Sequence, residues 1–224
     1  MENPATSSSE IKQSEINLYK RASLLAQITI FYNLFEGIVS VFLGMADETL
    51  SLFGFGIDSF VEVLSGIGIW NMIRRIRHNP DTNPGPFEKK ALRITGTAFF
   101  ILAAGLIITA VINLFQGHRP ETTFWGIVIA LISIFTMWAL IYFKVKVGRQ
   151  LNSDAILEDA NCTKFCLYLS FTLLLASLGF ELTGIGGIDS IGAILIAIFS
   201  FREGRESFEK ARGESCHCDY SESS

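Results

Sequence analysis

The chain has 224 residues, of which 50% are hydrophobic and only 18% are charged, and its mean hydropathy is positive. This composition excludes an ordinary water-soluble globule and favours a membrane protein. The net charge of −4 comes without a basic patch, so the sequence predicts no nucleic-acid partner.

The first 21 residues are polar and rich in Ser and Glu. They lack the charged-then-apolar arrangement of a cleaved signal peptide. We therefore expect residues 1–21 to form a disordered cytoplasmic tail.

Six apolar stretches follow, each close in length to the about 20 residues that a helix needs to cross the hydrocarbon core. They predict an all-α domain of six transmembrane helices over residues 22–201, with the fifth helix beginning near Asp159. Residues 202–224 are expected to form a charged helical extension and a cytoplasmic tail. The apolar stretches are residues 22–45, 50–73, 94–115, 124–143, 165–180 and 185–201.

The basic residues indicate how these helices are oriented, because Lys and Arg gather in cytoplasmic loops and tails. With six spans and the N-terminus inside, all but one of the 18 Lys and Arg lie in cytoplasmic segments, and only Arg119 lies outside. The sequence therefore predicts a multi-pass protein with both termini cytoplasmic. We expect it in the cell membrane, that is, the inner or plasma membrane.

Two carboxylates interrupt the second stretch, within GFGIDSFVEVLSG at residues 54–66. Asp58 and Glu62 are four residues apart and so project from one face of a helix. An ionised carboxylate at the bilayer centre costs about 2.5–3.5 kcal/mol. The pair could instead be protonated and hydrogen-bonded between helices, but no Lys or Arg lies at its depth. This absence favours a mobile cation as the partner.

Two cysteines repeat the same spacing in the fifth stretch, within EDANCTKFC at residues 158–166. Cys162 and Cys166 could pack as small hydrophobic side chains. Alternatively, two thiolates and two carboxylates from facing helices would supply the four ligands of tetrahedral zinc. Thiolates also suit softer ions. Because the cysteines fall on or near the cytoplasmic side, we expect thiols or metal ligands and no disulfide framework.

Further polar residues lie along the predicted helices. Asn33 and Glu36 share a face of the first helix, Asp159 precedes the cysteine pair, and Asp189 lies near the outer end of the sixth helix, where it could simply be solvated. We interpret these four as accessory or gating residues. Three residues of the tail are either a metal-capturing cluster or without function: Cys216, His217 and Cys218.

The six spans, the acidic pair on helix two and the ligand pair on helix five together resemble the cation diffusion facilitator family of divalent metal transporters. SDAILEDANCTKFC, at residues 153–166, resembles the segment that leads into that family's fifth helix, and residues 189–211 resemble its sixth helix and the amphipathic stretch after it. The family binds its ion with two residues on helix two and two on helix five. Carried over, these are Asp58, Glu62, Cys162 and Cys166.

The chain departs from the family in two respects. Helix five has Cys where the family usually has His and Asp, and the family's C-terminal cytoplasmic domain is missing, so we expect a truncated and divergent member. The resemblance implies a homodimer without enzymatic activity or an organic cofactor. Its partners would be the lipid bilayer, a divalent metal ion and protons.

The resemblance also implies a function. The chain would export a divalent, zinc-like cation from the cytoplasm by alternating access, in exchange for protons, through a site between helices two and five. The main alternative is a membrane-embedded metal sensor or interaction protein that binds an ion without transporting it. A proton-linked carrier of another small solute is a weaker alternative, since the spans carry no large polar set.

Overall fold

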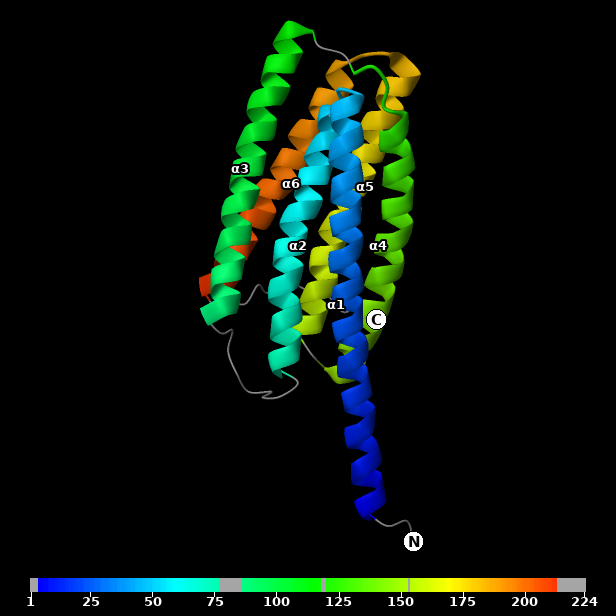
Figure 1. Cartoon of the computed structure of the whole chain (residues 1–224), viewed down its shortest axis with the longest axis vertical. Coiled ribbons are helices and arrows are strands. Elements are labelled where there is room, and N and C mark those ends of the chain that lie inside the picture. The colour runs from blue at the N-terminus through cyan, green and yellow to red at the C-terminus, as the bar shows by residue number, and fades with distance from the viewer. Residues whose placement is uncertain (1–3, 77–85, 118–119, 153, 213–224) are drawn as a thin grey trace, which may run out of the picture.

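The computed structural model describes residues 4–76, 86–117, 120–152 and 154–212, and within these residues the chain forms six long α-helices in one elongated bundle (Figure 1). This arrangement confirms the prediction of an all-α membrane protein. The helices are α1 (Pro4–Ala46), α2 (Leu50–Ile76), α3 (Pro86–Gln116), α4 (Phe124–Leu151), α5 (Asp154–Thr183) and α6 (Gly187–Arg212).

Each of the six helices extends beyond the apolar stretch from which it is predicted. The structure has α1 helical from Pro4, where the sequence predicts a disordered tail, and α5 begins at Asp154, ahead of the expected Asp159. The charged residues after position 201 continue α6 as far as Arg212. Adding a residue to an existing helix costs far less than starting one, so the spans continue into the segments that flank them.

Five of the six described helices contain a segment that is long and apolar enough to cross a membrane. The sixth helix, α6, is too charged to be counted with them. Every stretch of 18 residues within it contains at least three charged side chains, among them Asp189 or Arg202. It nevertheless packs as part of the bundle, beside α3, α5 and α2. The five segments are Asn17–Ala46, Leu50–Gly68, Leu92–Gln116, Phe124–Leu151 and Asp159–Thr183.

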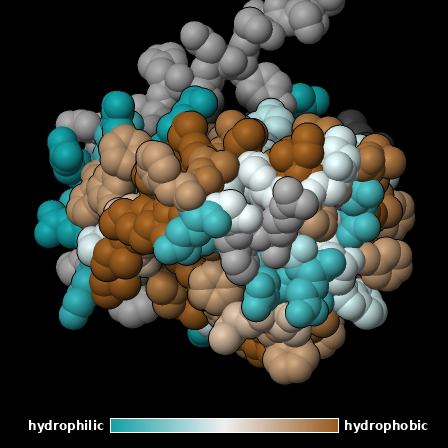
Figure 2. Space-filling view, turned by 90° about the horizontal axis from the view of Figure 1, so that it is seen from above, coloured by the Kyte–Doolittle hydropathy of each residue, from teal (hydrophilic) through white to brown (hydrophobic). Residues whose placement is uncertain are grey.

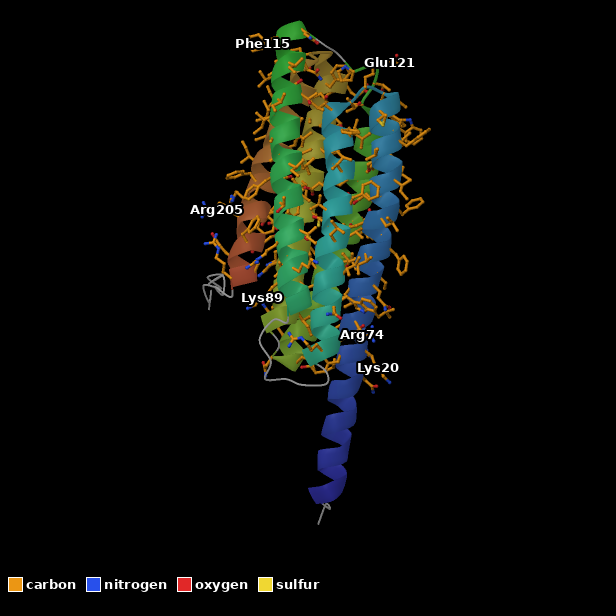
Figure 3. All side chains as sticks on the ribbon, turned by 60° about the vertical axis from the view of Figure 1, so that its left-hand side comes forward. Lys20, Arg74, Lys89, Phe115, Glu121 and Arg205 are labelled. Carbon is orange, nitrogen blue, oxygen red and sulfur yellow. The ribbon has the colours of Figure 1, made fainter. Side chains whose placement is uncertain are left out.

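The two ends of the bundle differ in charge. The short connections from α1 to α2 and from α5 to α6 lie at one end, and α1 projects beyond the other (Figure 1). Lys20, Arg74 and Lys89 lie toward the end from which α1 projects, whereas Phe115 and Glu121 lie at the opposite end (Figure 3). This separation is the one expected when basic residues stay on the cytoplasmic side. We refer below to the end with Lys20 as the inner end.

The bundle exposes apolar side chains around its outside. Phe31, Phe35 and Phe42 on α1 are each more than two-thirds exposed, as is Phe135 on α4. Viewed from the outer end, apolar residues form much of the rim, with hydrophilic groups scattered among them (Figure 2). Exposed apolar area of this extent suits contact with lipid. The interior also has an apolar core, which α2, α3, α4, α5 and α6 share; its buried members include Leu52, Phe55, Leu106, Leu169, Leu173 and Ile196.

Glycines bring α1 and α2 into backbone contact. A Cβ atom on Gly44 would lie 2.5 Å from the backbone nitrogen of Phe53, and one on Gly56 would lie 2.7 Å from that of Val41. No residue larger than glycine fits at either position without moving the helices apart. Small residues allow such close approach between helices in membranes. The contact sets the distance across which polar side chains of α1 and α2 can meet.

We predict that Gly56→Ala destabilises the protein by about 1–3 kcal/mol, the usual cost of adding a methyl group to a tightly packed interface. Thermal unfolding in detergent measures the effect. Gly105→Ala on α3 is the matched control, because a Cβ there meets no atom within 4 Å. Alanine also favours helix over glycine, so the control should be neutral or stabilising. Equal behaviour of the two variants would contradict the packing argument.

Candidate metal site

The Glu62 carboxylate lies where α1, α2 and α5 meet. Its Oε2 atom accepts a hydrogen bond from Asn33 Nδ2 on α1 at 2.9 Å. Its Oε1 atom accepts one from the Cys166 thiol on α5, with Sγ and Oε1 only 2.5 Å apart. Asn33 and Cys166 are buried, and Glu62 is half-buried. Three helices therefore converge on one carboxylate through an amide and a thiol.

Asp58, one turn nearer the outer end of α2, has a different partner. Its side chain is 2% exposed, and Oδ1 accepts a hydrogen bond from the Ser200 hydroxyl on α6 at 2.8 Å. Asp58 and Glu62 thus share a helix face but contact different neighbours. The pair connects α2 to α1, α5 and α6.

Glu36 is a third buried carboxylate, on α1. Tyr32 donates its hydroxyl to Oε1 at 2.9 Å, and the Ser59 hydroxyl is 3.3 Å from Oε2. Asn33 and Glu36 pair with α2 in antiparallel order, since Asn33 meets Glu62 and Glu36 meets Ser59. The sequence-predicted accessory residues on α1 therefore lie against the acidic helix.

Asp159 has a cationic partner that the sequence analysis does not predict. Lys144 Nζ on α4 lies 3.0 Å from Asp159 Oδ1 and donates a second hydrogen bond to the Thr163 hydroxyl at 2.9 Å. The Lys144 and Asp159 side chains are 1% and 7% exposed. Instead of remaining in a solvated cytoplasmic segment, Lys144 is buried between α4 and α5. In this structure Asp159 connects those two helices.

Asp189 on α6 caps the N-terminus of α2. Its Oδ2 atom accepts the backbone N–H of Leu50 at 2.8 Å, and Oδ1 accepts the backbone N–H of Ser51 at 3.1 Å and the Ser51 hydroxyl. A carboxylate at this position satisfies unpaired N–H groups and complements the positive end of the helix dipole. The Asp189 side chain is 2% exposed, so the structure does not support the solvated alternative.

The remaining predicted ligands lie outside the described part of the chain. The Cys162 side chain is among these, although its backbone belongs to α5, and so are Cys216, His217 and Cys218. Among the described residues, no three His, Cys, Asp or Glu side chains are grouped closely enough to hold a metal ion. The structure therefore brings Glu62 and Cys166 together, with Asp58 a turn away on Ser200.

Three residues that position these groups are not predicted from the sequence. Ser200 and Lys144 each hold a buried carboxylate, and Ser59 lies beside a third. A weak signal exists for Ser200 and Ser59, because each places a hydroxyl within a predicted apolar span. For Lys144 the sequence points the other way, because its charge predicts an exposed position on the cytoplasmic side.

Among the described residues, neutral groups donate the hydrogen bonds to the three carboxylates, Glu36, Asp58 and Glu62. These donors are hydroxyls, an amide and a thiol. Ionisable groups inside membrane spans are expensive and mark functional sites by default. Carboxylate oxygens next to a thiol can hold a divalent cation once the protons have left. The arrangement is therefore suited to exchanging protons for a metal ion.

Residues 26–213 match the family model described as the cation efflux transmembrane domain. The chain is also 25% identical, over 177 residues, to an uncharacterized transporter of Methanocaldococcus jannaschii, an alignment that covers 76% of this chain. The chain spans 62% of the length of that relative. The family match includes every helix that contributes to the Glu62 junction.

We predict that Lys144→Met destabilises the protein by about 3–5 kcal/mol, because it leaves the Asp159 carboxylate buried without its partner. The double variant Lys144→Met/Asp159→Leu should recover most of that loss. Denaturant unfolding in detergent micelles provides the measurement. Arg205→Ala, which removes the exposed pair with Glu209, serves as the control and should change stability little. A single Lys144 variant as stable as the wild type would contradict the buried pairing.

Proposed function

This chain belongs to the cation efflux family, and from that premise we propose that it carries a divalent metal cation out of the cytoplasm. The junction of α1, α2 and α5 around Glu62 is the proposed site. The observation that carries this proposal is the direct contact of an intramembrane carboxylate with a thiol from another helix. Both groups are metal ligands once deprotonated.

The proposed ligands are Asp58 and Glu62 from α2 with Cys162 and Cys166 from α5. A carboxylate at this depth is costly without a compensating charge, and a divalent cation provides one. The hydrogen bonds of Asp58 and Glu62 to Ser200 and Asn33 supply the supporting partners that orient metal ligands. Four ligands of this kind suit zinc, and the thiolates extend the range to softer ions.

Proton antiport follows from the same contact. The Cys166 thiol donates its proton toward Glu62 when no metal is bound. A metal ion entering from the cytoplasm displaces the thiol proton and any carboxyl proton, which leave to the cytoplasm. After the metal has left on the outer side, protons from that side occupy the empty ligands. The cycle therefore exchanges outward-moving metal for inward-moving protons.

The proposal also covers the membrane that holds the protein and its oligomeric state. We propose that the protein lies in the cell membrane, with the end that carries the basic residues facing the cytoplasm. We also propose a homodimer, for which the exposed apolar faces of the helices offer contact area. Binding of metal without flux across a membrane would instead assign the chain as a metal sensor.

We predict that Asp58→Asn and Glu62→Gln each reduce zinc flux into proteoliposomes by about 10–100-fold or more, because each removes a charged ligand. Both substitutions keep the size of the side chain and one acceptor oxygen, so the protein should remain folded. Glu209→Gln, at an exposed position late in α6, is the matched carboxylate control. Undiminished flux in both α2 variants would reject the site.

We predict that Cys166→Ser shifts the metal preference away from soft ions. A hydroxyl is a harder and poorer ligand than a thiolate, so affinity for Cd²⁺ and Zn²⁺ should fall more than affinity for Mn²⁺. Isothermal titration of the purified protein with each metal measures the change. The same ratio of affinities in wild type and Cys166→Ser would exclude sulfur coordination by this residue.

A further inference from the structure

One buried acceptor atom of the polar junction lacks a hydrogen bond. The Asn33 side chain is 1% exposed and donates from Nδ2 to Glu62 Oε2 at 2.9 Å. Its carbonyl oxygen, Oδ1, is buried and accepts no hydrogen bond from the described residues. Buried polar atoms are nearly always paired, so an unpaired one calls for an explanation.

Exchanging the two ends of the Asn33 amide does not remove the problem. While the proton of the empty site stays on the Cys166 thiol, the Glu62 carboxylate is ionised and only accepts hydrogen bonds, so the amide nitrogen is the end that suits it. Placing Oδ1 there would set two acceptors against each other and would also leave the N–H group unpaired. The unpaired oxygen therefore follows from the contact between Asn33 and Glu62.

The amide oxygen is attached to the same carbon atom as the nitrogen that touches Glu62. A cation that replaces the proton between Glu62 and Cys166 binds to the carboxylate that Asn33 already contacts. Rotation of the amide about its last side-chain bond exchanges its two ends, and that torsion is soft. The rotation turns the nitrogen away from the cation and brings the oxygen toward it.

We propose that Asn33 on α1 is a further ligand of the transported cation and helps determine which metal is accepted. With the site empty, its N–H group holds Glu62 in place; with the site loaded, its carbonyl oxygen coordinates the metal. The inference rests on the proposed function, because it requires a cation at Glu62. It adds a neutral, hard oxygen from a third helix to the proposed ligands of α2 and α5.

This role predicts a specific pattern of metal preference. Carbonyl oxygen suits hard ions such as Mn²⁺, whereas thiolate suits Cd²⁺. Loss of the oxygen should therefore weaken Mn²⁺ binding more than Cd²⁺ binding, the reverse of the pattern expected for Cys166→Ser. A residue that merely supported the fold would affect both metals equally.

The test is isothermal titration of the purified full chain with Mn²⁺ and Cd²⁺ at one fixed pH. Asn33→Ala should lose about tenfold or more in Mn²⁺ affinity, the range typical for a removed partner of a metal site, with a smaller loss for Cd²⁺. Asn33→Asp, which keeps an oxygen but lacks the amide N–H, should retain Mn²⁺ binding. Asn113→Ala on α3 is the matched control and should bind both metals as the wild type does.

Three outcomes would overturn the assignment. Unchanged affinities in Asn33→Ala would exclude the ligand, equal losses for both metals would indicate a structural role, and Asn33→Asp binding as weakly as Asn33→Ala would assign the effect to the N–H group. Glu62→Gln measured alongside separates this inference from the proposed function. If Glu62→Gln binds metal normally, the site itself is wrong; if it does not and Asn33→Ala does, only the role of Asn33 fails.

Discussion

The backbone contact between α1 and α2 is the constraint on which the polar interior depends. Gly44 and Gly56 allow the two helices to approach until backbone meets backbone. Short side chains can then bridge the interface, as in the bonds from Asn33 to Glu62 and from Ser59 to Glu36. In a membrane, the hydrophobic effect does little to hold helices together. Close packing must therefore keep these hydrogen-bonded groups in place.

The other helices attach to this pair through separate polar contacts. The buried Lys144 and Asp159 join α4 to α5, and among the described side chains α5 reaches Glu62 through the thiol of Cys166. On the opposite side, α6 holds α2 at Ser200 and at Asp189. The polar contacts thus group α4 with α5 and α2 with α6. The Glu62 junction lies between these groups, where a relative movement of the two would alter it.

The sequence predicts much of this arrangement because its strongest signals are local. The apolar stretches specify the spans, and the spacing of four puts Asp58 and Glu62 on one face. Which helix each carboxylate meets depends on the lateral order of the helices, and periodicity contains no information about that. The partner of Asp189 is a pair of backbone N–H groups, which no side-chain pattern reveals. Lys144 is counted with the cytoplasmic charges because burial of its pair with Asp159 is a tertiary effect.

The bond from Asp189 to the start of α2 also has a mechanical consequence. It fixes the outer end of that helix to α6, so a tilt of α2 must pivot there, at Leu50 and Ser51. With a rise of about 1.5 Å per residue, Asp58 lies about 12 Å and Glu62 about 18 Å from the pivot. Any such tilt displaces Glu62 about 1.5 times as far as Asp58. The carboxylate that joins α2 to α1 and α5 therefore moves farther in such a tilt than the one bonded to Ser200.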